Sequence, residues 1–580
     1  MLGNVASDVY NRWPGSNNST SEKVPSQLWY SPSGTIYRWG YEMRPEDSRI
    51  QYIKLLLDPD QELPPFVNRT ELERQLKTHK KTAVDAAADY LTKVHETTIQ
   101  ELVKRFGQNF VDKATIDYVL TVPAVWSDAA KDSTINAANM TGFAGSLRMI
   151  SEPEAAAVYA LSTMKPSELK IGDAYIVVDA GGGTVDLITY EIVKKQPLKF
   201  SEVVTGSGRL CGAGFLNIRF ERFMRSRFGD GAFKKMLKNK PRAWQIASEY
   251  FENYVKRNFA PSDDMERYDD NKFNVPFPGI PDDDSIGLDC GFLVITSAEV
   301  AEIFRPIVDK VSTLVENQRI EATRAGKTPK GVILVGGFGQ SSHLYSCLKQ
   351  RFADEEELPP LCSDPRPEGD REQAVLSMTT KNAKSLAVMS PMEILQPENA
   401  WTAVVRGAVL HGLDTRDLVA SRKARRHYGT LVTHPWNPQI HEEEDKFWDE
   451  CTESWRADRQ IHRFVKKGET VDSEKVIVQT FEHNSRIMGD NKTEELYVCD
   501  TDDVPKNFRP GRQSPVKLLC TVDIDTSKIP NRAYRKRRTS DDEEYYELGF
   551  QLGIHIESGR LKFDMRVNEK AYGEVLAKFE

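Results

Sequence analysis

The chain has 580 residues, of which 39% are hydrophobic and 28% charged, and its formal charge at pH 7 is -8. This length exceeds what one hydrophobic core usually supports, so we expect more than one domain, and a composition near the globular average excludes a collagen-like or mostly disordered chain. Because 78 basic residues are balanced by 86 acidic ones, general nucleic-acid binding is not expected.

The sequence carries no apolar run long enough to cross a bilayer. Its first residues, MLGNVASDVYNRWPG, lack the charged and apolar regions of a secretory signal. The seven cysteines are scattered and contain no Cys-x-x-Cys pair, which is typical of a reduced chain without a disulfide or zinc framework. We therefore predict a cytoplasmic protein that contacts no membrane.

The chain changes character along its length. Helix-like and strand-like segments alternate from about residue 50 to 413, which is typical of an α/β architecture, and we assign residues 1–413 to one domain. Residues 414–463 are weakly patterned and are predicted to form an inter-domain region. Residues 464–580 predict a smaller β-rich domain, with strands expected at Lys475–Phe481, Glu495–Cys499, Val516–Ile524, Tyr546–Ile556 and Leu561–Val567.

A charge reversal lies within the β-rich part. Four basic residues at 535–538 are followed by four acidic residues at 541–544. The position between two expected strands favours a solvated hairpin loop over a regulatory or nuclear-import element.

The strongest chemical signal is AYIVVDAGGGTVDLITYEI, residues Ala174–Ile192. An apolar strand runs into glycines 181–183 and Thr184, and a second strand follows. Glycines allow backbone angles that other residues avoid, and they bring N–H groups against an anion. Asp179 and Asp186 flank the turn, where carboxylates could hold the water shell of a magnesium ion or orient a water molecule. The rarity of the pattern favours a phosphate clamp over a glycine-rich turn between core strands.

A second glycine signal is GVILVGGFGQSSHLYSCLKQRF, residues Gly331–Phe352. A buried strand is expected to run into two glycines, and Ser341 or Ser342 is expected to cap the following helix. This combination lets a flat ligand approach the backbone, although many α/β folds end strands with two glycines for purely structural reasons. Two such turns, far apart in sequence, are expected when two lobes close over one nucleotide.

Four segments in this order and spacing resemble the nucleotide-binding domain of the heat shock protein 70 family, within the actin and sugar-kinase superfamily. They are VLTVPAVWSDAAKDSTINAANMTGF, SLRMISEPEAAAVYAL, VVDAGGGTVDL and VILVGGFGQSSHL. The flanks look most like divergent fungal relatives, and the resemblance covers roughly residues 13–413. It implies a bilobed actin-like (ribonuclease H-like) ATPase domain that binds ATP or ADP with Mg²⁺, followed by the β-rich domain.

The resemblance assigns catalytic roles to four residues. Asp179 and Asp186 would lie on the side of the magnesium ion, which they would hold through water, or of the catalytic water. Glu152 in SEPEAAA would orient water near the metal, and Lys54 resembles the lysine that contacts the γ-phosphate. Structural alternatives stay open, because Glu152 could be a first-turn acid of a helix and Lys54 a solvated lysine.

The resemblance also names the nucleotide-binding positions, with Phe338 lying against the base or ribose and Lys256 packing over the adenine, although Lys256 could equally lie on a solvated helix face. The full set expected to bind the cofactor is Gly181, Gly182, Gly183, Thr184, Gly212, Lys256, Gly336, Gly337 and Phe338. Pro123 with Lys131 matches a proline switch and its basic partner, which report nucleotide state to the neighbouring domain. Pro123 could instead simply end a strand.

The sequence departs from the family at both ends. Relatives carry a first phosphate motif, D-x-G-T-[ST], before the segment at Trp13–Gly15, and this chain starts after it. We expect either an N-terminally incomplete sequence of an active ATPase, or a pseudo-enzyme. Residues 463–471 and 550–565 faintly resemble the substrate-binding β-sandwich, whereas the usual linker, helical lid and acidic tail are not recognisable.

Three functions follow from the resemblance. The favoured one is an ATP-dependent ATPase that couples nucleotide state to a C-terminal domain, with a peptide or protein client and a nucleotide-exchange or co-chaperone partner. The second is a nucleotide-sensing scaffold without useful hydrolysis. The third, a small-molecule kinase of the same superfamily, is weaker because the block from VPA to EPEAAA points to the chaperone branch.

Overall fold

The computed structural model describes most of the chain as two compact units. The first comprises Met1–Val158, Val193–Gly206 and Val405–Glu580, and the second comprises Tyr159–Ile192 and Ser207–Val404. The described residues are 8–34, 36–44, 46–59, 63, 67–143, 147–164, 169–260, 272–353, 390–413, 418–473, 475–489, 492–508, 514–524, 526, 529–557, 561–568 and 570–579.

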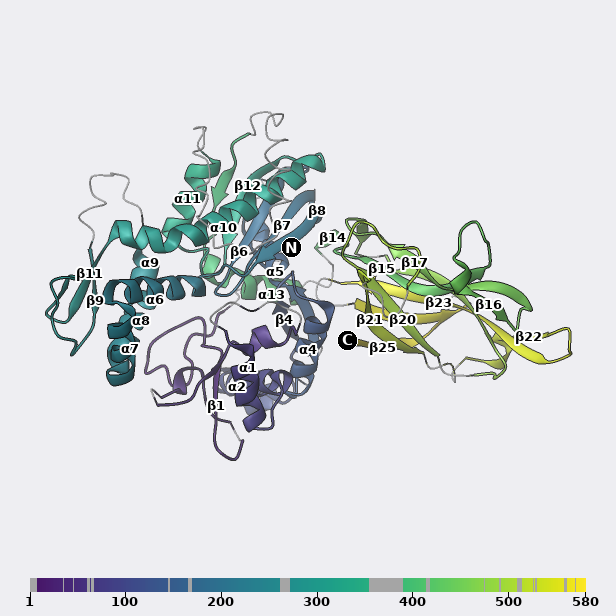
Figure 1. The fold of residues 1–580 in the computed structure, drawn as a ribbon, viewed down its shortest axis with the longest axis horizontal. Helices are drawn as coiled ribbons and strands as arrows, with labels where there is room; N and C mark the ends of the chain where they lie inside the picture. Colours follow the sequence, from purple (N-terminus) through teal and green to yellow (C-terminus); the bar gives the residue numbers. More distant parts are fainter. Residues whose placement is uncertain are drawn as a thin grey trace. The chain divides into compact units, whose positions relative to one another are not determined.

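The second unit is built around a strand that is buried along its whole length. Every residue of β6 (Ala174–Ala180) is buried, as expected for a strand covered on both faces. β6 pairs in parallel with β12 (Pro329–Val335) and antiparallel with β7 (Val185–Lys195). The long helix α10 (Ser297–Arg324) belongs to the same apolar core, which therefore fixes the ends of β6 and β12 (Figure 1).

Helices and a small sheet complete the second unit. α10 begins with a capping box between Thr296 and Glu299, the arrangement that satisfies the first free N–H groups of a helix. The remaining elements are α6 (Gly214–Phe228), α7 (Asp230–Asn239), α8 (Pro241–Tyr250), a π-helical turn (Phe251–Val255), α9 (Lys256–Asn258), β9 (Lys272–Pro276), β10 (Leu288–Asp289), β11 (Phe292–Thr296), α11 (Ser342–Phe352) and β13 (Glu393–Leu395).

The N-terminal part of the first unit is a mixed α/β region. β4 (Tyr118–Val122) and β5 (Leu147–Ser151) pair in parallel, and β1 pairs with both β2 and β3. The other elements are β1 (Gln27–Tyr30), β2 (Ile36–Trp39), β3 (Ile50–Gln51), α1 (Arg69–Thr78), α2 (Ala83–Phe106), α3 (Gln108–Val111), α4 (Asp128–Asn139), α5 (Glu152–Thr163), β8 (Leu198–Arg209) and α13 (Ala403–Leu413).

The C-terminal part of the first unit consists mainly of strands. Nine strands follow the order β16-β17-β15-β20-β21-β25-β24-β23-β19, and β22 pairs with β23 beside this path. Alternate residues of β24 are buried, which is the pattern of a strand with one face on a core. The strands are β15 (His427–Pro435), β16 (Lys446–Asp449), β17 (Ser454–Val465), β19 (Ile477–Ser485), β20 (Lys492–Cys499), β21 (Val516–Ile524), β22 (Arg535–Arg538), β23 (Glu544–Ile556), β24 (Leu561–Val567) and β25 (Lys570–Phe579).

The predicted α/β fold class with a β-rich continuation is confirmed, and all five expected strands are present. The stretch 414–463, predicted as an inter-domain region because its sequence is weakly patterned, contains in its described part β14 (Val419–Lys423), β15, β16 and most of β17. In β17 polar side chains occupy both faces, so the alternation of a strand is hidden. The predicted domain boundaries stay predictions.

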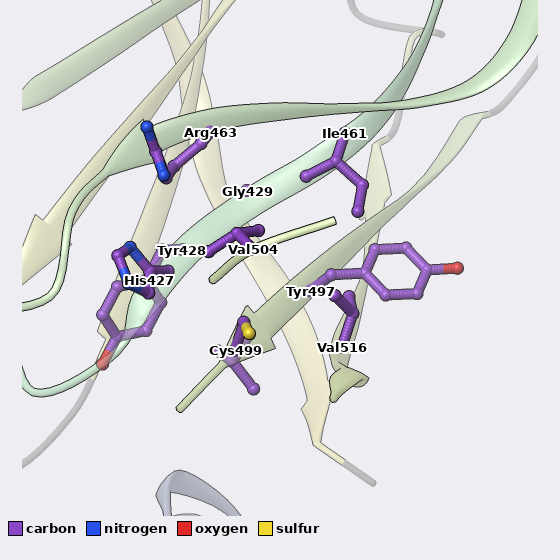
Figure 2. A pocket seen from close by; sticks show the side chains of 10 residues that line it. His427, Tyr428, Gly429, Ile461, Arg463, Tyr497, Cys499, Val504 and Val516 are labelled. Carbon is purple, nitrogen blue, oxygen red and sulfur yellow. The ribbon is translucent and has the colours of Figure 1, made fainter. Parts of the chain in front are cut away.

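A small open hollow lies within the β-rich sheet. His427, Arg463 and Cys499 line it together with the apolar side chains of Ile461 and Val516 (Figure 2). None of the sequence-predicted site residues lines this hollow. Across the described part of the chain, no helix is both long enough and apolar enough to span a membrane.

Candidate nucleotide site

The glycine hairpin predicted from the sequence joins β6 to β7. The N–H of Gly181 donates to the carbonyl of Thr184 at 2.9 Å, which closes the turn. Asp179 and Asp186 are directly opposite each other in the two strands. Their exposed fractions are 6% and 1%, so two carboxylates lie buried beside the turn.

A second segment clamps the hairpin from the side of α6. The N–H groups of residues 212, 213 and 214 donate to the carbonyls of residues 183, 181 and 182 at 3.1, 3.0 and 2.8 Å. A Cβ atom on Gly212 would lie 2.6 Å from the carbonyl carbon of Gly182, so only glycine permits this approach. Among the described residues, no backbone acceptor is assigned to the N–H groups of Gly182 and Gly183, and both residues are exposed. They therefore offer two donors to a ligand.

The second predicted glycine turn meets the first at the end of β6. The N–H groups of Phe338 and Gly339 donate to the carbonyl of Ala180 at 2.8 and 3.1 Å. Gly336 has φ +88°, and a Cβ atom there would lie 2.3 Å from Oδ1 of Asp179. Two turns that are distant in sequence thus converge on the carboxyl end of a buried strand, the usual place for a ligand in an α/β sheet.

The helix after the second turn begins as predicted. The Ser341 hydroxyl accepts a hydrogen bond from the N–H of Leu344 at 3.3 Å, so Ser341 is the N-cap of α11. Gly337, which follows Gly336, is half-buried.

Phe338 and Lys256 are both engaged with the protein. The Phe338 ring is 3% exposed and belongs to the apolar core, with Phe304 at 6.4 Å between ring centroids. This packing does not favour the expected contact with a base or ribose. The Lys256 ammonium donates to the carbonyl of Ala213 at 3.3 Å and pairs with Glu252, and burial lowers its pKa. Lys256 therefore braces the segment at the start of α6.

The first unit brings together two other predicted catalytic residues. Glu152 is the first residue of α5, and Lys54 lies in a 3-10 turn at residues 53–56. The Lys54 ammonium forms an ion pair with the Glu152 carboxylate, and it lies 5.4 Å from the centre of the Trp126 ring. Residues separated by almost a hundred positions thus share one surface, with the lysine about half exposed.

The proposed switch residues are both buried. Pro123 follows β4, and Lys131 lies on α4 with 7% exposure. The Lys131 ammonium is 3.7 Å from a carboxylate oxygen of Asp128. Burial lowers the pKa of Lys131, and the neighbouring Arg425 lowers it further, against the attraction of Asp128.

Sequence reasoning missed a buried ion pair that joins α5 to β14. An Nη2 atom of Arg422 lies 2.7 Å from the carboxylate of Glu154, and both side chains are under a tenth exposed. The strand that carries Arg422 pairs in parallel with β8, where the buried Glu202 accepts the N–H of Lys423 at 3.0 Å. No local pattern signals this pair, because its members are 268 positions apart.

The oxygen donors near the hairpin fit a magnesium ion held through water. Asp179 and Asp186 supply carboxylates, the ligand type that Mg²⁺ prefers, while it keeps several waters of its own. Among the described residues, a group of three closely spaced metal-type ligands occurs only at Asp282, Asp289 and Cys290, all of them exposed. The hairpin carboxylates are therefore the better candidates for a magnesium site next to phosphate.

Comparisons with known proteins point to one family. A family model described as Hsp70 protein matches residues 67–357, which include both glycine turns. Human heat shock 70 kDa protein 12B is 24% identical over 520 residues, covering 74% of this chain and 68% of that protein. Human heat shock 70 kDa protein 12A is 22% identical over 621 residues, covering 91% and 83%. A chaperone protein HscA homolog of Acinetobacter baumannii is 30% identical over 171 residues, covering 30% and 24%. The chain belongs to the Hsp70 protein family, and this membership implies that it binds ATP or ADP.

Proposed function

We propose that the protein hydrolyses ATP with Mg²⁺ and couples its nucleotide state to the β-rich C-terminal part. One observation carries the proposal: the two glycine turns meet at the end of β6, beside the buried carboxylates of Asp179 and Asp186. Backbone donors that need no rearrangement are well suited to hold phosphate during transfer of the γ-phosphoryl group.

Each part of the hairpin has a distinct task in this proposal. The exposed N–H groups of Gly182 and Gly183 donate to phosphate oxygens. Asp179 and Asp186 would hold a magnesium ion through water and would orient the attacking water. A bound magnesium ion supplies charge neutralisation on the phosphates.

Glu152 and Lys54 are proposed to act in the hydrolytic step. Glu152 would orient the water, and Lys54 would contact the γ-phosphate. The same ion pair also favours a second candidate, a nucleotide-sensing scaffold without useful hydrolysis, because Lys54 already neutralises Glu152.

The coupling proposal rests on α5 and β14. Glu152 and Glu154 are two residues apart in the first turn of α5, and Glu154 holds Arg422 of β14. A shift of the start of α5 with nucleotide state would therefore act on β14, which leads directly into the β-rich strands. Pro123 and Lys131 are proposed to take part in this coupling.

The β-rich part is proposed to bind a peptide or protein client. Two large side chains on neighbouring strands support this proposal: Trp448 is 47% and Trp455 51% exposed, with ring centroids 5.3 Å apart. Exposed aromatic side chains of this kind are common in binding surfaces. A nucleotide-exchange or co-chaperone partner and a cytoplasmic location remain predictions.

The decisive experiment measures two quantities on the same protein: affinity for a fluorescent ATP analogue with magnesium, and phosphate release in a single turnover. Binding together with release supports the ATPase, and binding without release supports the scaffold. Asp179→Asn should lose mainly hydrolysis. Absence of nucleotide binding by a folded protein would exclude both candidates.

A further inference from the structure

The β22–β23 hairpin presents a serine at its tip. All four residues of β22 (Arg535–Arg538) are exposed, and β23 is the only strand that pairs with it among the described residues. The turn is closed by the N–H of Asp542 donating to the carbonyl of Thr539 at 3.0 Å, with Asp542 at φ 65°. Ser540 is the second residue of this turn and is exposed.

The residues before Ser540 form a distinctive charge pattern. Basic side chains occupy the second to fifth positions before the hydroxyl. Two Arg-Arg pairs occur in the sequence, at 425–426 and 537–538, and only the second has a serine or threonine two positions after it. Arginine forms strong, geometrically specific bonds to carboxylates, so an enzyme with an acidic substrate groove can read this pattern.

We propose that Ser540 is a phosphorylation site for a protein kinase that reads Arg537 and Arg538. The Oγ atom of Ser540 forms a bond to the γ-phosphorus of ATP as the bond to the leaving oxygen of ADP breaks, and the hydroxyl proton passes to the catalytic base of the kinase. The product carries a charge of about -2 at neutral pH where the chain had none.

The geometry favours a kinase that reads the basic side rather than the acidic residues after Ser540. The residues before the serine lie in an extended edge strand, the conformation in which peptides bind grooves. The acidic residues after it are folded into the turn, where the N–H of Thr539 donates to the carbonyl of Glu543 at 2.9 Å.

The arginines are available despite their present partners. Arg538 pairs with both Asp542 and Glu544 at 2.7 Å, and Arg537 pairs with Glu547 at 3.2 Å. Both arginine side chains are half exposed, and exposed ion pairs contribute little to stability. Exchange of these partners for carboxylates of a kinase groove is therefore inexpensive.

Phosphorylation would separate two loops that the hydroxyl now holds together. The Ser540 N–H donates to Oε2 of Glu453 at 2.8 Å, and its hydroxyl bonds the other carboxylate oxygen. Glu453 lies in the turn between β16 and β17, the hairpin that carries Trp448 and Trp455. A phosphate against this carboxylate is repelled, so the β16–β17 turn is expected to detach from the tip.

The test treats the full chain with the catalytic subunit of cyclic-AMP-dependent protein kinase, an arginine-directed enzyme, and locates phosphate by mass spectrometry. Phosphate is expected on Ser540, to be lost in Ser540→Ala and kept in Thr539→Val. The variant with both Arg537→Gln and Arg538→Gln should be phosphorylated about tenfold less efficiently or worse, since it loses charge-assisted bonds. Phosphorylated protein should be cut faster than mock-treated protein by a glutamate-specific protease at Glu450 and Glu453.

Three results would overturn the proposal. The first is an unmodified Ser540 in the folded chain when a peptide of residues 533–546 is modified under the same conditions. The second is equal phosphorylation of the double arginine variant. The third is modification of Ser540 only by an acid-directed kinase. Unchanged protease sensitivity after complete phosphorylation would disprove the release of the β16–β17 turn while leaving the site itself in place.

Discussion

Arg422 and Glu154 form a buried ion pair between β14 and α5, at 2.7 Å and with side-chain exposures of 9% and 3%. Arg422 also donates to the hydroxyl of Ser473 at 2.6 Å. The pair ties the strand that precedes the β-rich sheet to the helix whose first residue is the predicted catalytic Glu152.

Glu154→Ala is expected to lower the free energy of unfolding of the first unit by about 3–5 kcal/mol, because it leaves a buried guanidinium without its charge partner. In Glu154→Leu/Arg422→Leu the loss should be much smaller than the sum of the single losses. Urea titration measures the free energy of unfolding of both variants. Trypsin cleavage near residues 422–426 should be faster in Glu154→Ala than in the unchanged protein. Glu71→Gln, which removes an exposed pair with Arg74, is the matched control and should leave stability nearly unchanged. If Glu154→Ala and Glu71→Gln lowered the free energy of unfolding equally, the stabilising role of the buried pair would be contradicted.

Gly336→Ala should distort the junction of the two glycine turns. A Cβ atom at this position meets Oδ1 of Asp179 at 2.3 Å and the carbonyl oxygen of Ala180 at 2.5 Å, with φ at +88°. We expect a cost on the order of 2 kcal/mol or more and a matching loss of nucleotide affinity. Thermal unfolding measures the stability, and titration with a fluorescent nucleotide measures the nucleotide affinity. Gly231→Ala in α7, where a Cβ meets nothing within 4 Å, should leave both values unchanged or slightly improved.

Much of the candidate site could be predicted from the sequence, because short stretches of neighbouring residues determine its turn and its helix cap. Three consecutive glycines between two apolar strands permit a tight turn, and the structure has that turn between β6 and β7. The cap at Ser341 follows from side-chain chemistry in the same way. The bounds of the strand Leu561–Val567 follow from clean alternation of apolar residues.

The rest depends on packing that no local pattern encodes. Phe338 follows the glycine turn as a ligand-contacting ring would, yet its side chain fills the core beside Phe304. β17 escaped detection because only Ala457, Gln460 and Val465 of its twelve residues are buried. The pairing of Arg422 with Glu154 depends on the tertiary fold alone.

His343 predicts a pH dependence of stability. Its ring packs on Phe259 and Phe304, with centroids at 4.6 and 5.2 Å, and burial lowers its pKa from 6.5 to about 4. The unfolded chain therefore takes up a proton near pH 6.5 that the folded chain resists. The contribution of His343 to the free energy of unfolding is therefore fully present above pH 6.5. It falls by up to about 3 kcal/mol as the pH is lowered towards 4. Urea titrations between pH 7 and pH 4 should show that the free energy of unfolding falls less steeply with pH in His343→Gln than in the unchanged protein. The same pH dependence in both proteins would refute the role of His343.

The tryptophan pair on β16 and β17 predicts client binding. Trp448→Ala combined with Trp455→Ala should weaken capture of an unfolded polypeptide by about fivefold or more, because exposed aromatic residues commonly dominate binding energy. Fluorescence anisotropy with a labelled unfolded protein measures the effect. The control is Val478→Ala, which should bind normally. Val478 lies on the same sheet and is likewise an exposed apolar residue, with 40% of its surface accessible. Equal binding by all three proteins would place the client elsewhere.

Gly182→Val and Glu152→Gln should separate nucleotide binding from hydrolysis. A Cβ atom at Gly182 meets no protein atom within 4 Å, so the valine should leave thermal stability unchanged while its side chain covers the exposed N–H groups. Loss of nucleotide affinity in a stable Gly182→Val protein would therefore identify the hairpin as the phosphate-binding surface, and retained affinity would exclude it.

Glu152→Gln keeps the shape of the side chain but removes the carboxylate that orients water. Nucleotide affinity should persist in this variant while single-turnover phosphate release slows by about 10²–10⁴-fold. A Glu152→Gln protein that releases phosphate at the original rate would assign Glu152 to its ion pair with Lys54 rather than to hydrolysis.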